Sequence, residues 1–366
     1  MAGFESAYQI NRRRKRIDML AATQHDREAA SDYALLKNFG ITAVRDGIRW
    51  YCIQHPRGRY DFSSLAPMVE AACEQGTQVI WALCHYGWPD DLDVFSPAFV
   101  DQFAKYCSAV ARFMAQYSDG IPFYTPINEI SFLAWAAGHD GSFYPHETTR
   151  AWELKCQFIR AAVAAREAIL AVQPKARFVH VDPLIHVLTP RDNPALADEA
   201  AAKHASQFQA WDMLSGRHCP ELGGTEPMLD IMGVNFYHSN QWEYPDNRLR
   251  WEDTPRDERW IPLHKLLADI YQRYHRPLFI AETSHFGVGR GLWLREIAAE
   301  VVEARKIGVP LEGVCIYPIL DRPDWEDPDH WHNSGLWDLV PENGNLRRVL
   351  NEEYAADLRW AQALVS

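Results

Sequence analysis

The feature that most constrains the fold of this 366-residue chain is a repeated alternation of short apolar runs with longer amphipathic stretches. The apolar runs lie at about 2–9, 41–49, 77–84, 122–128, 176–182, 229–236, 277–282 and 311–317. The amphipathic stretches lie at 26–39, 62–75, 97–117, 148–173, 195–215, 259–274, 292–308 and 346–364. This spacing is typical of repeated βαβ units in a parallel sheet. It predicts an α/β fold, a (β/α)8 TIM barrel.

Two segments illustrate the two kinds of element. Within 97–117, Phe99, Phe103 and Cys107 recur at four-residue steps and form one apolar stripe of a helix. The run TQVIWALC at 77–84 is almost continuously apolar, as expected for a strand that is covered on both faces. Both patterns favour a ring of strands surrounded by helices.

The chain is predicted to form one domain, residues 1–366. No Pro-, Gly- or Ser-rich linker and no low-complexity tract divides the sequence, although 183–194 and 239–258 are loop-like. Barrels of this length are commonly single domains. Their functional side chains gather at the C-terminal ends of the strands, so polar residues that end apolar runs are the candidates for a site.

The net charge and the terminal sequence indicate which classes of partner to expect. The chain has 37 Lys and Arg against 49 Asp and Glu, a net charge of −12, whereas nucleic acids require a broad basic face. No apolar run is long enough for a membrane span. The start MAGFESAYQINRRRKR has its charges after the apolar part, unlike a secretory signal, and the seven cysteines lack CxxC spacing. We expect a cytoplasmic protein with buried free thiols and neither a nucleic-acid nor a membrane partner.

Two glutamates stand at the ends of apolar strands. The run IPFYTPINEI delivers Asn128 and Glu129, and the run RPLFIAETSHFG delivers Glu282. A buried carboxylate costs several kcal/mol unless it is paired, so the alternative to a functional pair is two ion-paired structural glutamates. Cleavage of a sugar acetal needs such a pair, one carboxyl to protonate the leaving oxygen and one carboxylate to stabilise or trap the anomeric carbon. The separation of the two carboxyl groups would decide between retention and inversion.

The order of motifs along the chain resembles the β-glycosidases of glycoside hydrolase family 1. GFESAYQI resembles the first-strand segment of the family and places Gln9 at its sugar-binding glutamine. VRDGIRW places Arg45 beside the nucleophile, and CHYGWPDDL places His85 at the sugar-binding histidine. TPINEI resembles the acid/base motif, with Asn128 near the sugar 2-hydroxyl and Glu129 as the proton donor.

The second half of the chain continues the resemblance. GVNFYH places Tyr237 as a hydrogen-bond donor to the nucleophile, with Asn235 nearby. FIAETS places Glu282 as the nucleophile, and GVCIYPILDRPDW aligns with the segment that closes the sugar pocket. Arg45 and Tyr237 would favour an ionised Glu282, whose charge would in turn raise the pKa of Glu129.

The sequence departs from the family pattern at positions that bear on substrate. Ile130 replaces the usual proline after the acid/base, and Thr283-Ser284 replaces Asn-Gly after the nucleophile. Tyr317 replaces a tryptophan floor, and Asp324 replaces a longer glutamate that grips the outer hydroxyls. The chain is also shorter than typical members, which implies trimmed loops on the aglycone side.

Three aromatic side chains are candidates for stacking against a pyranose ring, with the hydrophobic core as the alternative for each. They are Trp88, Tyr317 and Trp325. Together with Gln9, His85 and Asp324 they complete the expected substrate-binding set.

The resemblance implies a retaining β-glycosidase that acts from the non-reducing end of small glycosides through a covalent intermediate on Glu282, without cofactor or metal. The glycone stays open among glucoside, galactoside, mannoside and modified bacterial sugars, and so does the oligomeric state. The alternatives are a catalytically silent or transglycosylating sugar-binding barrel for an unusual or anionic sugar, and a metal-dependent barrel hydrolase.

Two charged segments each have more than one possible role. The basic run RRRKR at 12–16 follows the first strand and either attracts an anionic sugar or forms a solvated loop. The segment WEDPDHWHN at 325–333 is rich in His and acidic residues, but no HExxH or Cys/His spacing accompanies it. We therefore expect it to cap the pocket rather than bind a metal.

Overall fold

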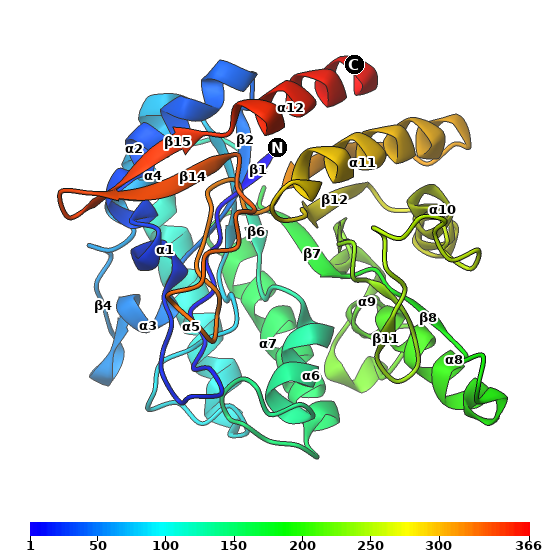
Figure 1. Ribbon diagram of the computed structural model, residues 1–366. Helices are drawn as coiled ribbons and strands as arrows, with labels where there is room; N and C mark the ends of the chain where they lie inside the picture. The colour runs from blue at the N-terminus through cyan, green and yellow to red at the C-terminus, as the bar shows by residue number, and fades with distance from the viewer.

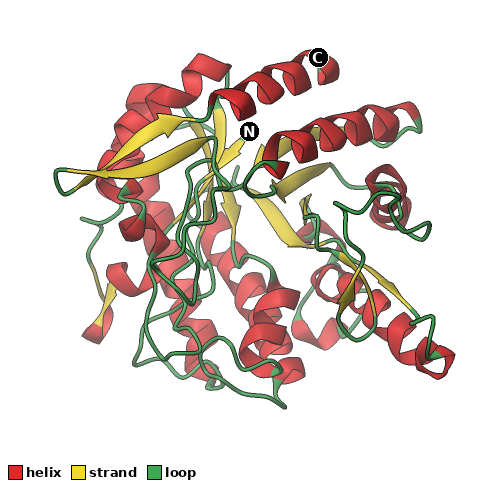
Figure 2. Ribbon diagram, in the orientation of Figure 1, coloured by secondary structure: helices red, strands yellow, loops and turns green.

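The computed structural model describes residues 1–366, apart from the side chain of Arg57. A closed barrel of parallel strands occupies the centre, with helices around it (Figures 1 and 2). The barrel strands, in chain order, are β1 (Ala2–Gly3), β2 (Ala43–Gly47), β5 (Gln78–Ala82), β6 (Phe123–Thr125), β7 (Arg177–Pro183), β9 (Ile231–Asn235), β12 (Leu278–Thr283) and β13 (Leu311–Ile316). Each predicted apolar run contains one of these strands, and the predicted (β/α)8 fold is confirmed.

The two ends of the chain close the barrel. Ala2 of β1 pairs in parallel with Ile316 of β13 on one side and with Val44 of β2 on the other. Only Ala2–Gly3 pair as a strand, so the run expected at 2–9 leaves the sheet early. The residues that follow turn toward the C-terminal ends of the strands, which is where the site described below lies.

Helices cover the outside of the barrel and run along its periphery in Figure 1. They are α1 (Met19–Ala22), α2 (His25–Leu36), α3 (Trp50–Ile53), α4 (Ala66–Gln75), α5 (Pro97–Met114), α6 (Ile130–Gly138), α7 (Ala151–Leu170), α8 (Ala197–Ala205), α9 (Gln209–Leu214), α10 (Leu263–Tyr274), α11 (Gly289–Lys306) and α12 (Glu352–Val365). Local signals set some of their ends. Helix α5 begins at Pro97 after Ser96, and α4 ends at Gly76, whose φ of 63° suits a glycine.

The barrel interior is filled with side chains. Inward-facing residues of β7 and β12 alternate along their strands, so Val179 and Val181 meet Phe279 and Ala281. Gly233 lies between them, and a Cβ at this position would approach the Ala281 Cβ to 2.7 Å. The interior is therefore a packed core rather than a pore, and any ligand must bind at one end of the barrel.

Three expectations about peripheral segments need correction. The helix expected across 346–364 starts only at Glu352, because residues 346–350 belong to the hairpin of β14 (Trp337–Glu342) and β15 (Asn345–Leu350). The loop-like segments 183–194 and 239–258 hold a small sheet of β8 (His186–Leu188), β10 (Gln241–Glu243) and β11 (Asn247–Arg248). A further short pair is β3 (Gln54–His55) and β4 (Arg59–Tyr60). Pairing between strands, which the periodicity of a single segment does not encode, explains these differences.

Two bulk expectations can also be compared with the structure. All seven cysteines are free thiols, but they are not all buried, since Cys73 is exposed. Among the described residues, no helix combines the length and the apolar character that crossing a membrane requires.

A buried charge network ties the outer elements to strand β2. His25 lies 2.8 Å from both Asp32 and Asp46, and Arg348 of β15 donates to both oxygens of Asp32 at 2.7 and 2.8 Å. Burial alone would lower the pKa of His25, but the two carboxylates outweigh it and raise the pKa to about 9. Protonated His25 and Arg348 thus balance Asp32 and Asp46 inside the protein.

We predict that the stability of the fold falls at alkaline pH through His25. The folded pKa is above the unfolded value, so the stabilisation is complete below about pH 6.5 and is lost as pH rises through about 9. The free energy of unfolding should fall by up to about 3 kcal/mol between pH 6.5 and 10. Urea unfolding across this pH range measures it. His25→Gln should flatten this pH dependence, whereas the exposed His330→Gln should leave it unchanged; equal slopes in the three proteins would contradict the prediction.

Candidate active site

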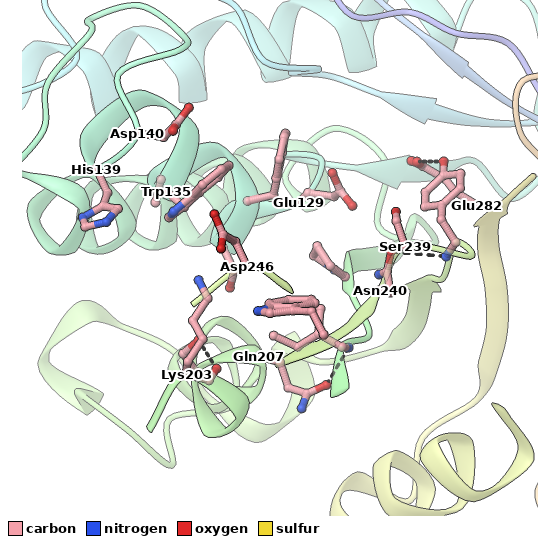
Figure 3. A pocket seen from close by; sticks show the side chains of 18 of the residues that line it. Glu129, Trp135, His139, Asp140, Lys203, Gln207, Ser239, Asn240, Asp246 and Glu282 are labelled. Carbon is pink, nitrogen blue, oxygen red and sulfur yellow. Dashed lines mark hydrogen bonds between the residues drawn. The ribbon is translucent and has the colours of Figure 1, made fainter. Parts of the chain in front are cut away.

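A cavity of about 1230 Å³ opens at the C-terminal ends of the barrel strands. Its buried end is formed by Glu5, His85, Glu129, Glu282 and Tyr317, each less than one-tenth exposed. Figure 3 shows the cavity extending from Glu282 past Glu129 toward the more open region around Trp135 and Lys203. The two glutamates predicted from the sequence therefore share one cavity.

Glu282, at the end of β12, is held in a charged environment. Its Oε1 accepts a hydrogen bond of 2.9 Å from Nη1 of Arg45, and its Oε2 accepts one of 2.8 Å from the hydroxyl of Tyr237. Arg45 is only 3% exposed and also donates to the carbonyl of Ala281 at 2.7 Å. A guanidinium and a phenol hydroxyl thus satisfy the two oxygens of this carboxyl group and fix its orientation.

Glu129 lies between β6 and α6 and has a different environment. Its Oε1 accepts a 2.8 Å hydrogen bond from Asn235, and the hydroxyl of Tyr86 donates to its Oε2. Burial and then the negative charge of Glu282 raise the pKa of Glu129 to about 8, although the bonds from Tyr86 and Asn235 oppose the rise. Glu129 is therefore protonated near neutral pH.

The backbone at Glu129 is strained and is fixed from the neighbouring strand. Its φ is 49°, a left-handed value that is uncommon outside glycine and that recurs at active sites. Its N–H donates to the carbonyl of Val181 at 3.0 Å, and Asp182 accepts hydrogen bonds from the N–H and hydroxyl of Ser131, both at 3.0 Å. Strand β7 thus anchors the start of α6 and the direction of the Glu129 side chain.

Asn128 and His85 connect the pair with the rest of the buried end. Asn128 accepts a 2.7 Å hydrogen bond from Nη2 of Arg45, and its amide nitrogen lies 3.2 Å from Nε2 of His85. The other ring nitrogen of His85 lies 2.9 Å from the hydroxyl of Ser6. Burial, followed by the charges of Arg45 and Arg322, lowers the pKa of His85 well below 6.5, so the imidazole is neutral.

The predicted substrate-binding residues divide into two groups. His85, Tyr317 and Trp325 line the cavity together with the catalytic candidates Glu129, Tyr237 and Glu282. Gln9, Trp88 and Asp324 are not among the described lining residues. Trp88 packs against Phe99, Tyr144 and Phe158. This is the place in the hydrophobic core that was given above as the alternative to sugar stacking.

Gln9 and Asp324, the other two residues of the second group, have different surroundings. Gln9 is 1% exposed, and neither of its amide atoms has a hydrogen-bond partner among the described residues. Asp324 Oδ1 accepts from the N–H groups of Glu326 and Asp327 at 2.7 and 3.0 Å, and its Oδ2 lies 3.0 Å from Nε2 of His332. The Asp324 carboxylate therefore stabilises the turn of its own loop.

Three residues of the site were missed by the sequence reasoning. Glu5 and Arg322 line the cavity, and Tyr86 both lines it and binds Glu129. Each stands inside a motif already quoted, and Tyr86 directly follows His85. The usable signal was the acidic Glu5 inside the first apolar run, which shows that the strand ends earlier than expected.

The basic run does not contribute to the described lining of the cavity. Arg12 pairs with Asp140 and Arg16 pairs with Asp90, while residues 13–15 are exposed. Two of its charges are thus neutralised at the surface, and the others face solvent.

A possible metal-ligand group lies beside the cavity, away from 325–333. Ligand atoms of His238, Glu252 and His285 lie within 4.8 Å of one another, a residue set that zinc accepts. However, Nε2 of His285 already lies 2.9 Å from Glu252, and the two imidazole rings have centroids only 4.0 Å apart. Hydrogen bonding and ring packing account for this group without an ion.

Comparisons with known proteins identify the family and support the barrel fold. The family model described as glycosyl hydrolase family 1 matches residues 7–215, more than half of the chain. A β-glucosidase from Thermotoga maritima solved with castanospermine has a TM-score of 0.74 at 16% identity, over 94% of this chain and 88% of that one. A β-glucosidase from Thermotoga maritima solved with noeuromycin has a TM-score of 0.73 at 17% identity, over 94% of this chain and 88% of that one. No curated protein sequence matches the chain.

We predict that the protonation of Glu129 depends on the charge of Glu282. Infrared titration should show a protonated carboxyl band that is lost near pH 8 and that is absent from Glu129→Gln. In Glu282→Gln the negative charge is removed, so the midpoint should shift to lower pH.

Asp182 is the required control for this titration, because burial raises its pKa to about 7. Asp182→Asn should remove a separate band and leave the one that titrates near pH 8. An unchanged midpoint in Glu282→Gln would show that the two glutamates are not electrostatically coupled.

Proposed function

The chain belongs to glycosyl hydrolase family 1 and is a glycoside hydrolase, and from this premise we propose that it is a retaining, exo-acting β-glycosidase. The observation that carries the proposal is the difference between the two buried glutamates. Glu282 is paired with Arg45, while Glu129 has neutral donors and a pKa of about 8. One ionised and one protonated carboxyl group are the two states that a retaining mechanism needs at its start.

In the proposed first step, Glu129 gives its proton to the glycosidic oxygen while a carboxylate oxygen of Glu282 attacks the anomeric carbon. The bond to the aglycone breaks, and a covalent glycosyl ester on Glu282 forms. Arg45 and Tyr237 lie on the two Glu282 oxygens and limit its nucleophilicity until the substrate binds. Asn128 accepts from Arg45 through its oxygen, and its amide nitrogen donates to the hydroxyl of Tyr86 at 3.1 Å, so a sugar 2-hydroxyl would share this amide group with Tyr86.

In the second step, Glu129 is ionised and takes a proton from water, which attacks the anomeric carbon and releases Glu282. Loss of the Glu282 charge in the ester lowers the pKa of Glu129, which helps it to act as a base. Two inversions at one carbon give net retention.

The shape of the cavity supports exo action. Its buried end is closed by Glu5, His85 and Tyr317, which leaves room for a terminal sugar, whereas the aglycone would extend toward Trp135 and Lys203. We further propose that residues 1–366 work as one catalytic domain. Strands β1 and β13, from the two ends of the chain, pair with each other and bring Glu5 and Tyr317 together.

We predict that Glu282→Ala lowers kcat/KM on a panel of neutral aryl β-glycosides by about 10³-fold or more, because the covalent step is lost. Azide should partly restore turnover of activated substrates and give an α-glycosyl azide, since it attacks from the face that Glu282 vacates. The exposed Glu312→Ala on β13 is the matched control and should keep full activity.

Proton NMR of the first anomer released by the wild type completes this experiment. Retained activity in Glu282→Ala, or a first product of inverted configuration, would contradict the proposed mechanism.

We predict that kcat/KM falls as pH rises through about 8, because Glu129 must be protonated in the free enzyme. Tyr86 donates to Glu129 and thereby stabilises its charged form, so Tyr86→Phe should move this alkaline limb to higher pH. The pH profile of initial rates measures both. A limb that stays in place or moves to lower pH in Tyr86→Phe would exclude Glu129 as the group that titrates.

A further inference from the structure

Glu5 is a buried carboxyl group that the proposed mechanism does not use. It follows strand β1, lines the cavity and is only 5% exposed. Burial raises its pKa, and the charge of Arg322 opposes the rise. A carboxylate kept at such a position is costly unless its oxygens are satisfied, so its contacts call for an explanation.

The two oxygens of Glu5 have different surroundings. Oε1 accepts hydrogen bonds from the N–H of Ala7 at 3.0 Å and from the hydroxyl of Tyr317 at 3.3 Å. Oε2 faces Nε of Arg322 at 3.3 Å, which is a loose ion pair. Oε1 is thus satisfied by two hydrogen bonds, whereas Oε2 has only the loose ion pair and keeps acceptor capacity in a residue that lines the cavity.

Arg322 supplies the complementary donors. Its Nη1 donates to the carbonyl of Pro323 at 3.0 Å, and its guanidinium carbon lies 5.1 Å from the ring centroid of Trp325. Both Arg322 and Trp325 line the cavity. A guanidinium carries more N–H groups than these contacts use, so donors remain for a ligand beside the Glu5 acceptor.

The position of Glu5 relative to the catalytic candidates follows from a chain of contacts. Arg45 joins Glu282 to Asn128, and Asn128 lies 3.2 Å from Nε2 of His85. The same nitrogen of His85 lies 3.9 Å from Oε1 of Glu5. Glu5 therefore lies beside His85, and the side chains of Arg45 and Asn128 stand between it and Glu282 along this chain of contacts. We assign this place to the ring carbons remote from the anomeric carbon.

We propose that Glu5, together with Arg322, grips the hydroxyl groups of the glycone that are remote from its anomeric carbon and so selects neutral, hydroxyl-rich sugars. The assignment rests on the proposed glycosidase function. A carboxylate accepts from one hydroxyl, and the adjacent guanidinium donates to its neighbour, which fits two vicinal hydroxyls.

Glu5 thereby takes the role that the family resemblance assigned to Asp324. Both Asp324 oxygens are engaged within the loop, by Glu326, Asp327 and His332. Reaching a sugar would require breaking these bonds. The carboxylate that we assign to the outer hydroxyls is therefore Glu5, just after the first strand, rather than Asp324, which follows the last strand.

The charges of the buried end support a neutral sugar. Arg45 is paired with Glu282 and Arg322 with Glu5, so each guanidinium is already offset by a carboxylate. His85 is neutral because burial lowers its pKa. At this end of the cavity, a uronate or a sugar phosphate would meet Glu5 and Glu282 beside guanidinium groups that are already paired, and it would be disfavoured.

The test uses aryl β-glycosides of the best neutral glycone and of its singly deoxygenated analogues, each with wild type and with Glu5→Gln. We expect Glu5→Gln to lower kcat/KM on the parent by about 10- to 100-fold, the value of a charge-assisted hydrogen bond. On the analogue that lacks the contacted hydroxyl, the two proteins should differ by less than about threefold. Glu312→Gln, at an exposed site on β13, is the matched control and should equal the wild type throughout.

Further variants distinguish direct binding of a sugar hydroxyl from an effect on the position of Glu5. Tyr317→Phe removes the hydroxyl that holds Glu5, and its loss should be similar for every analogue because no sugar hydroxyl is addressed. Arg322→Gln should give a selective loss for the neighbouring hydroxyl, and it serves as the second test if Glu5→Gln does not fold. Wild type should also prefer neutral glycones to glucuronide and 6-phospho analogues by at least about tenfold.

The outcomes are distinguishable from failure of the function itself. A wild type that is inactive on every glycoside refutes the glycosidase and this inference with it. An active wild type with equal parent-to-analogue ratios in Glu5→Gln and Arg322→Gln overturns the inference alone. Two other results would also overturn the inference alone. One is a loss of activity that depends on the hydroxyl in Asp324→Asn but not in Glu5→Gln, and the other is a preference of the wild type for an anionic glycone.

Discussion

The buried ion pair between Arg45 and Glu282 is the interaction on which the site depends. It joins strand β2 to strand β12 and holds two charges that are each less than one-tenth exposed. Removing either partner would leave an uncompensated charge inside the barrel, a cost of several kcal/mol. The same guanidinium reaches Asn128, so a single side chain fixes three strand ends relative to one another.

This pair also makes the two glutamates different. Glu282 has a cation on one oxygen, whereas Glu129 is surrounded by the neutral Tyr86 and Asn235 and experiences the charge of Glu282. Two residues of the same type in one cavity thereby have different partners, and burial and the charge of Glu282 raise the pKa of Glu129 to about 8.

The buried end repeats this arrangement with a second guanidinium. Arg322 faces Glu5 as Arg45 faces Glu282, and neutral His85 lies between the two pairs. The cavity is therefore polar but nearly balanced in charge at the end where a sugar would lie. An environment of this kind favours many hydrogen bonds over long-range attraction.

The sequence by itself determined the barrel and indicated the two candidate glutamates. The period of apolar runs is a local property, and a strand that ends in Glu129 or Glu282 delivers that side chain to the same end of the barrel wherever the loops go. Periodicity could not predict the strand at 346–350, because it forms by pairing with β14 and not by its own pattern. Only the tertiary structure decided between Asp324 and Glu5. A motif gives the residue type at a position, but the partner of each carboxylate depends on the folded chain. His332 meets Asp324 through the conformation of one loop, and Arg322 meets Glu5 through contact between the two ends of the barrel sequence.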